Sequence, residues 1–141
     1  MEPVKIDLDK LSEIWPPFQF NIWVKCDTPI QREEIYNALR DNNLQNPNLK
    51  VDYELIWDIS SREVHVARIA WMVRYWSDHF PIDIDFGVPH FMSGTLEISD
   101  GNHRLLAAYY LNKPYIMAQC SGSISEIEKY AYHGHNSKIS S

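Results

Sequence analysis

The sequence has 141 residues, of which 45% are hydrophobic and 23% are charged, and its formal net charge is −6. This length predicts a single domain over residues 1–141, and the composition is typical of a globular protein with a substantial core. A chain this acidic lacks the broad basic surface that nonspecific nucleic-acid binding requires. The sequence shows no signal-peptide pattern and no apolar run long enough to cross a membrane, so we expect a cytoplasmic protein without a membrane partner.

Three stretches of the N-terminal region have the residue pattern of β-strands. Residues 4–8 alternate apolar and polar side chains, which favours an edge strand. Residues 20–25 alternate more loosely and residues 51–59 are rich in β-prone residues, so both are predicted to be strands. The remainder of residues 1–19 and the Asn-rich run over residues 42–50 are expected to be irregular.

Two capping boxes predict the first two long helices. Residues 28–31, with Pro29 at the first helical position, open a helix that ends near residues 41–43. Residues 60–63 open the longest helix, over residues 61–78. Helical spacing predicts the inward faces, which are Ile35, Ala38 and Leu39 in the first helix and Val66, Ile69, Ala70, Val73 and Trp76 in the second.

Polar residues of the longest helix are expected at the surface. Arg62, Arg68 and Arg74 form a local basic cluster on it, and Arg68 falls on the side opposite the apolar stripe. His65 and His79 are expected to be surface or partly buried residues.

The next elements are a strand, a hairpin and a helix. Residues 81–86 alternate strictly between apolar and acidic residues, which predicts a short strand. A turn at residues 93–94 leads to a second short strand over residues 96–98. The helix that follows Gly101 should end before Pro114, because the residue before a proline avoids the helical region.

The C-terminal part completes the predicted fold. Residues 115–121 form a last strand, and a third capping box opens a helix within residues 123–135. This helix should run to about His133 with Gly134 as its stop signal, and residues 136–141 should be a frayed tail. Strands and helices mix without strict alternation, so the predicted class is α+β, a small mixed sheet with packed helices.

The turn from Asp100 to Arg104 joins a predicted strand to a predicted helix. Gly101 permits backbone angles that other residues resist, and the first N–H groups of the helix, at the positive end of its dipole, favour an anion. Arg104 can bind phosphate oxygens with its planar guanidinium, His103 can exchange a proton near neutral pH, and Asn102 can donate and accept hydrogen bonds. The alternative is ordinary helix capping by Asp100, with His103 and Arg104 solvated.

A longer pattern surrounds this turn. It runs Pro81-Ile-Asp-Ile-Asp-Phe-Gly87, then Gly94-Thr-Leu-Glu-Ile-Ser-Asp-Gly-Asn-His-Arg-Leu-Leu-Ala-Ala108, then Tyr115-Ile-Met-Ala-Gln-Cys120. These stretches resemble the core of the ParB/sulfiredoxin superfamily, also described as ParB-like nuclease domains. The resemblance covers residues 60–122, while residues 1–59 are an N-terminal region of unassigned type.

The resemblance implies that the G-x-x-R turn, here Gly101 to Arg104, binds a phosphate, usually that of a nucleotide. Members of the superfamily include nucleotide-dependent DNA clamps, sulfinic-acid reductases, nucleases and small-molecule kinases. Asn102 stands where sulfiredoxins have their reactive cysteine, which argues against sulfinic-acid reduction. The E-N-x-x-R segment and basic helix-turn-helix of the clamps are not visible after Asn112, so the resemblance favours the nuclease-like and uncharacterised branches.

We therefore expect a protein that handles the phosphate of a nucleotide or a nucleic acid, as a metal-dependent nuclease, NTPase or phosphotransferase. The expected catalytic residues are His103, Arg104 and Asp100. The expected phosphate-binding residues are Gly101, Asn102, His103 and Arg104.

Carboxylates near this turn are candidate ligands for Mg²⁺ or Mn²⁺. Asp83 and Asp85 point to the same side of their strand, which is the spacing of a shared divalent ion, and the alternative is a strand whose outer face is merely hydrated. Asp100 is a further carboxylate for that ion. Weaker candidates for metal or site contacts are Glu54, Asp58, His90, Glu97, His133 and His135.

Two other functions are compatible with the sequence. In the first, the chain is a non-catalytic interaction or inhibitor protein with a vestigial or regulatory nucleotide pocket, and its aromatic-rich N-terminal region contacts a protein partner. In the second, it is a redox enzyme, which requires a reactive thiol near Gly101. Cys26 and Cys120 are each expected to be small buried strand residues.

Overall fold

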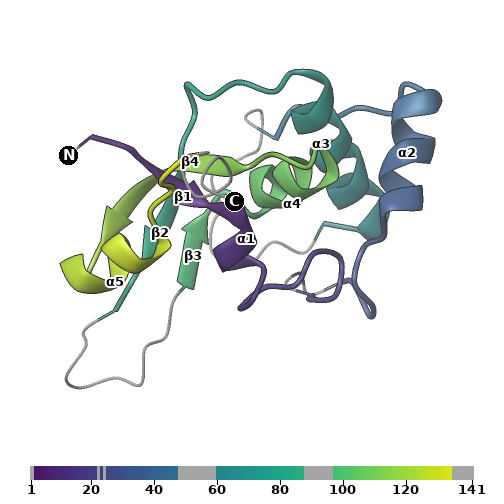
Figure 1. Cartoon of the computed structure of the whole chain (residues 1–141). Helices are drawn as coiled ribbons and strands as arrows, with labels where there is room; N and C mark the ends of the chain where they lie inside the picture. The colour runs from purple at the N-terminus through teal and green to yellow at the C-terminus, as the bar shows by residue number, and fades with distance from the viewer. Residues whose placement is uncertain (1, 22, 24, 48–59, 88–96, 135–141) are drawn as a thin grey trace, which may run out of the picture.

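Four strands form one mixed sheet in the order β1-β4-β2-β3 in the computed structural model, which describes residues 2–21, 23, 25–47, 60–87 and 97–134 (Figure 1). Strand β4 lies antiparallel to β1 and parallel to β2, and β2 lies antiparallel to β3. The predicted α+β class with a small mixed sheet is confirmed. The strands are β1 (Val4–Asp7), β2 (Ile82–Asp85), β3 (Glu97–Asp100) and β4 (Tyr115–Ser121).

Helices α2 and α4 pack on α3, and α1 packs on β1 and β4. Figure 1 shows α3 between α2 and α4, and α3 contacts both of these helices, while α4 also contacts β2 and β4. Among the described residues, no helix is both long and apolar enough to span a bilayer. The helices are α1 (Leu8–Leu11), α2 (Arg32–Arg40), α3 (Arg62–Arg74), α4 (Asn102–Tyr110) and α5 (Ile124–Tyr130).

One buried cluster joins the two halves of the sequence. It includes Ile6 of β1, Ile35 of α2 and Ile69 of α3, each without exposed surface, together with side chains of β2, α4 and β4. Burying one such isoleucine contributes roughly 1.5–3 kcal/mol relative to leaving it exposed. Residues 1–59 and residues 60–122 therefore contribute to the same core, and this core fixes where α4 begins.

Several predicted elements agree with the structure. Strand β1 is an edge strand at residues 4–7 and β2 covers residues 82–85, both as the alternation of side chains predicts. Strand β4 covers the predicted residues 115–121. Helix α2 ends at Arg40, and α4 ends at Tyr110, ahead of Pro114.

The prediction of a strand over residues 20–25 is wrong for the residues described there, which form a loop. Cys26 donates its N–H to the Trp23 carbonyl at 3.1 Å, and the Asn21 side-chain amide donates to the Cys26 carbonyl. The turn places the Trp23 ring against the rings of His65 and His103. This tertiary contact overrides the weak strand pattern of residues 20–25.

The first two predicted helix starts are each displaced along the chain. The N-cap of α2 is Gln31, whose N–H donates to the Glu34 carboxylate at 2.8 Å, so the box is 31–34 rather than 28–31. The displacement follows from Arg62, whose guanidinium binds the carbonyls of Thr28 and Pro29 and holds them outside the helix. The N-cap of α3 is Ser61 rather than Ser60, and its hydroxyl accepts from the Val64 N–H at 3.4 Å.

Two helices are shorter than predicted. Helix α3 ends at Arg74 rather than near residue 78, because the chain turns toward β2 and the Ser77 carbonyl accepts a hydrogen bond from Arg104. Helix α5 ends at Tyr130 rather than near His133, because the next residues pair with β1. Ala131 bridges Ile6, and the Tyr132 N–H donates to the Lys5 carbonyl at 2.8 Å.

Helix α1 is absent from the sequence prediction, which treats the residues after β1 as irregular. Asp7 caps it by accepting from the N–H groups of Asp9 and Lys10 at 2.9 and 3.3 Å. The signal is a single Asp before one helical turn, too short for an apolar stripe to repeat.

Some predictions lie outside the described residues. They are the strand over 51–59, the turn at 93–94, the tail at 136–141, and the weaker candidates Glu54, Asp58, His90 and His135.

Candidate phosphate site at the start of helix α4

Gly101 is the residue at which β3 gives way to α4. It is the N-cap of α4 with φ 105° and ψ 21°, in the left-handed region, where a side chain is strained. A Cβ atom at this position would lie 2.3 Å from Cγ2 of Ile82 in β2. Only glycine fits both the backbone angle and this close approach, and the contact holds the first turn of α4 against the sheet.

The first turn of α4 carries no acidic residue of its own, and Gly101 has no side chain to cap the helix. Gly101 occupies the N-cap position and Asp100 ends β3, while the expected capping by the Asp100 side chain concerns a side chain outside the described part of the structure. The backbone N–H groups of Asn102, His103 and Arg104 precede the first intrahelical bond, which the Leu105 N–H makes to the Gly101 carbonyl at 2.9 Å. This end of the helix therefore has a positive potential.

Arg104 points inward. Its side chain is 6% exposed and its guanidinium donates to the Ser77 carbonyl at 3.3 Å. The guanidinium also lies over the rings of Trp76 and Phe80, with its carbon 5.7 and 5.5 Å from the ring centres. These contacts tie α4 to the segment between α3 and β2, and they differ from the solvated position that the helix-capping alternative gives Arg104.

His103 is joined to a second histidine that sequence reasoning missed. The distance from His103 Nε2 to His65 Nδ1 is 3.0 Å, and the ring centres are 5.2 Å apart with planes inclined at 21°. These values place the two imidazoles side by side, linked at their edges by an N–H···N hydrogen bond. Which nitrogen donates depends on the tautomer of each ring.

The Trp23 ring lies against both imidazoles. Its centre is 4.4 Å from that of His65 and 4.7 Å from that of His103, with interplanar angles of 19° and 20°. The three rings come from the loop before α2, from α3 and from α4. The cluster therefore appears only when these three segments meet.

The burial of His65 and Arg68 corrects the sequence interpretation of α3. His65 has no exposed surface, whereas it was expected to be at the surface or partly buried, and Arg68 is 5% exposed, whereas it was expected on the outer side of the helix. Because α3 packs between α2 and α4, more than one face of this helix is covered. A usable signal was the helical spacing of His65 with Ile69 and Met72, which places it on an inward face. His79 is exposed, as expected.

The acidic strand β2 lies beside the turn. Its register pairs Asp83 with Asp100, with an irregularity between Asp83 and Ile84. Asp83 and Asp85 are both exposed, while Ile82 and Ile84 are buried and Ile82 faces Gly101, so the two carboxylates lie on the other face of the strand. Asp85 accepts a hydrogen bond from the Gly87 N–H at 2.9 Å.

The described residues include no group of three or more His, Cys, Asp or Glu side chains that could hold a metal ion. The side chain of Asp100 lies outside the described part of the structure. The role of Asp83, Asp85 and Asp100 as metal ligands therefore stays a prediction.

Both cysteines are buried thiols. Burial raises the pKa of Cys120, in β4, to about 11. Burial also raises the pKa of Cys26, against a lowering by Arg62, and Cys26 lies in a loop rather than in the expected strand. A raised pKa disfavours the thiolate that redox chemistry requires, so burial opposes a reactive thiol at both positions.

Comparison with protein-family models, with curated proteins and with solved structures found no match to this chain.

Proposed function

We propose that this chain binds the phosphate of a nucleotide or of a nucleic acid at the first turn of α4, in a fold of the ParB/sulfiredoxin type. The observation that carries the proposal is a helix opened by a left-handed glycine at its N-cap, with His103 in its first turn hydrogen-bonded to His65. The positive end of α4 favours an anion, and its backbone N–H groups are the matching donors.

The order of elements around this turn supports the fold assignment. The motif that resembles the superfamily falls on strand β2, on β3 followed by α4, and on β4. In the structure, β2 is the neighbour of both other strands, so the three parts of the motif are adjacent in space as well as ordered in sequence.

Within the proposal, the chemistry is hydrolysis of a phosphodiester or of a nucleotide. The amides of Asn102, His103 and Arg104 stabilise negative charge on the phosphate oxygens, and His103 accepts or donates a proton. Arg104 is assigned no direct contact with the ligand, because it is buried and its guanidinium donates a hydrogen bond to the Ser77 carbonyl. A divalent ion is assigned no step, because Asp83 and Asp85 lie on the opposite face of β2 from Ile82.

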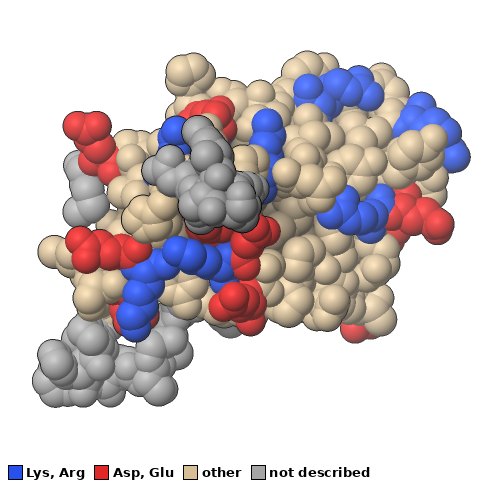
Figure 2. Space-filling view, viewed as in Figure 1, with Lys and Arg blue, Asp and Glu red and all other residues tan. Residues whose placement is uncertain are grey.

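A second candidate is a non-catalytic interaction or inhibitor protein that retains the pocket. The inward position of Arg104 favours it, since a guanidinium that ties α4 to residue 77 has a structural role whether or not a ligand binds. Figure 2 shows basic and acidic side chains both occurring across the face in view, and the net charge is −6, which fits a partner other than bare nucleic acid.

A ligand screen tests the first candidate. Thermal unfolding is followed with inorganic phosphate, with ATP, GTP and CTP, and with a short single-stranded oligonucleotide, each with and without Mg²⁺ or Mn²⁺. A ligand at 100 times its Kd stabilises the folded state by about 2.7 kcal/mol, which raises the melting temperature measurably. Absence of any shift together with absence of phosphodiesterase and NTPase turnover would reject the proposal and leave the second candidate.

Asn102→Asp is the variant that locates the binding site. It places a negative charge on the first residue of α4, where it repels an anion but is compatible with a helix N-terminus. Asn43→Asp, on the exposed chain after α2, makes the same change in net charge elsewhere. Loss of the ligand-induced shift in Asn102→Asp and its retention in Asn43→Asp are the expected results, and an equal effect in both would place the ligand elsewhere.

A further inference from the structure

We infer that His65 is the positioning residue for His103, and that with Trp23 it determines which ring nitrogen of His103 meets a phosphate ester at the start of α4. The inference rests on the proposed function and deepens it, because it adds a residue outside the D-G-N-H-R motif to the same site. It is carried by the 3.0 Å contact between His65 Nδ1 and His103 Nε2.

The contact defines the orientation of the His103 ring. Since Nε2 is directed at His65, any proton that His103 exchanges with a bound ligand passes through Nδ1. Turning the imidazole over would break the hydrogen bond to His65. The Trp23 ring, 4.7 Å from that of His103 and nearly parallel to it, covers one face of the imidazole and restricts its tilt.

His65 is itself held rigidly. It has no exposed surface, and it lies in α3, a helix of 13 residues that packs against both α2 and α4. A group on a packed helix positions its neighbour more accurately than a group on a loop does. His103 is half-buried and lies in the first turn of α4, so the pair extends from the core to the edge of the candidate site.

The pair can take up one proton while both rings stay in place. With His103 Nε2–H donating to His65 Nδ1, the lone pair on His103 Nδ1 accepts a proton from the attacking water. The Nε2 proton then moves across the hydrogen bond to His65 Nδ1. The pair ends with one additional proton and one positive charge, the water becomes hydroxide, and the face of the Trp23 ring stabilises the charge.

Nitrogen NMR of the imidazole rings tests the positioning directly. In protein labelled with ¹⁵N-histidine, a fixed tautomer gives His103 one pyrrole-like and one pyridine-like nitrogen, with widely separated resonances. His65→Phe keeps a planar ring against Trp23 but removes the hydrogen bond. We expect the two His103 resonances to move toward a common averaged value in this variant, and unchanged resonances in a folded His65→Phe protein would overturn the inference.

Two further variants separate positioning from folding. His65→Asn retains a short polar group near the place of Nδ1 and is expected to restore much of the wild-type separation of the His103 resonances. His79→Phe replaces an exposed histidine and is the matched control, expected to leave His103 unchanged. If His65→Phe fails to fold, His65→Asn still decides, because a folded His65→Asn protein with His103 fully averaged would contradict the inference.

Turnover is measured with bis(4-nitrophenyl) phosphate as the probe, with and without Mn²⁺. We expect His65→Phe to lower kcat by about 10- to 100-fold with little change in KM, since a displaced base affects the transition state more than binding. Equal kcat in wild type and His65→Phe would overturn the inference. If the His103 resonances respond as expected but wild type neither binds nor cleaves any phosphate probe, the proposed function fails while the coupling of His65 to His103 stands.

Discussion

Helices α2 and α4 begin in opposite ways. At α2, the Gln31 N–H donates to the Glu34 carboxylate, and Glu33 and Glu34 place two negative charges in the first turn. Arg62 then pairs with Glu34 at 2.7 Å. At α4, the N-cap is a glycine, and the first turn holds His103 and Arg104 with no acidic residue.

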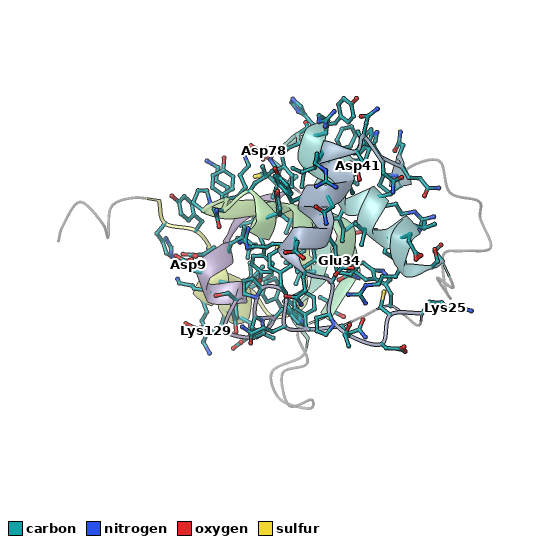
Figure 3. The ribbon with its side chains drawn as sticks, turned by 90° about the vertical axis from the view of Figure 1, so that its right-hand side faces the viewer. Asp9, Lys25, Glu34, Asp41, Asp78 and Lys129 are labelled. Atoms are coloured by element: carbon teal, nitrogen blue, oxygen red, sulfur yellow. The ribbon has the colours of Figure 1, made fainter. Side chains whose placement is uncertain are left out.

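The difference separates a structural helix end from a candidate binding site. The start of α2 is neutralised by its own side chains, and Figure 3 shows Glu34 and Asp41 toward the two ends of this helix. The first turn of α4 has a glycine N-cap and no acidic residue, so its local sequence is unfavourable for an isolated helix. Sequences depart from the locally favourable choice most often at functional positions.

The largest effect is expected from Gly101→Ala. A methyl group there meets Ile82 at 2.3 Å in a backbone conformation that alanine resists, so we expect a loss of about 3–5 kcal/mol in the free energy of unfolding, measured by urea denaturation. Gly134→Ala is the control, since Gly134 also has a positive φ, 76°, but its nearest neighbour is 4.0 Å away. A similar loss in both variants would show that backbone strain alone, rather than the contact with β2, explains the glycine.

A smaller loss of stability is expected when the interactions that neutralise the N-terminus of α2 are removed. Glu34→Gln removes the carboxylate that Arg62 and the Gln31 N–H bind, and should lower the free energy of unfolding by about 1–2 kcal/mol. Asp41→Asn breaks the exposed pair with Arg40 at the other end of the helix and should have no measurable effect. Equal stability of Glu34→Gln and wild type would mean that the pair contributes nothing.

The lowered pKa of the Glu34 carboxylate predicts that the stability of the protein depends on pH. Hydrogen bonds from Arg62 lower the pKa of Glu34, burial opposes this, and the Gln31 N–H lowers it further. Because the pKa is lower in the folded protein, the stabilisation is present above the unfolded pKa, about 4.3, and is lost as the pH falls through the folded value. In urea unfolding between pH 6 and pH 3, the free energy of unfolding should therefore decline more steeply for wild type than for Glu34→Gln. Parallel curves for the two proteins would show that Glu34 is not the origin of the pH dependence.

The smallest effect on stability is expected when the first turn of α4 is given a negative charge, as the first turn of α2 already has. In the absence of ligand, Asn102→Asp should raise the free energy of unfolding by about 0.3–1 kcal/mol, because a negative charge near a helix N-terminus is favourable. The gain should shrink in high salt. Thermal unfolding at low and high salt measures it, and destabilisation at low salt would show that the start of α4 is not electropositive.

The residues that repeat with a clear period were predictable. The alternation in β1 and β2 and the proline after α4 correctly place these elements, because burial on one face imposes the period and proline ends a helix. The starts of α2 and α3 were misplaced because neighbouring residues could each act as caps, and only Arg62 and Ser61 decide between them. Residues 20–25 were misjudged because a loose alternation does not distinguish a strand from a loop.

The sequence by itself determined the turn and the residue types at the start of α4. A glycine followed by Asn102, His103 and Arg104 already specifies a sharp turn, donors and a basic first turn, since these depend on local backbone geometry and residue type. Tertiary structure alone decided that Arg104 turns inward to Ser77 and that His65 and Trp23 meet His103. These contacts join segments distant along the chain, and their positions follow from the packing of α3 against α4, which no local pattern encodes.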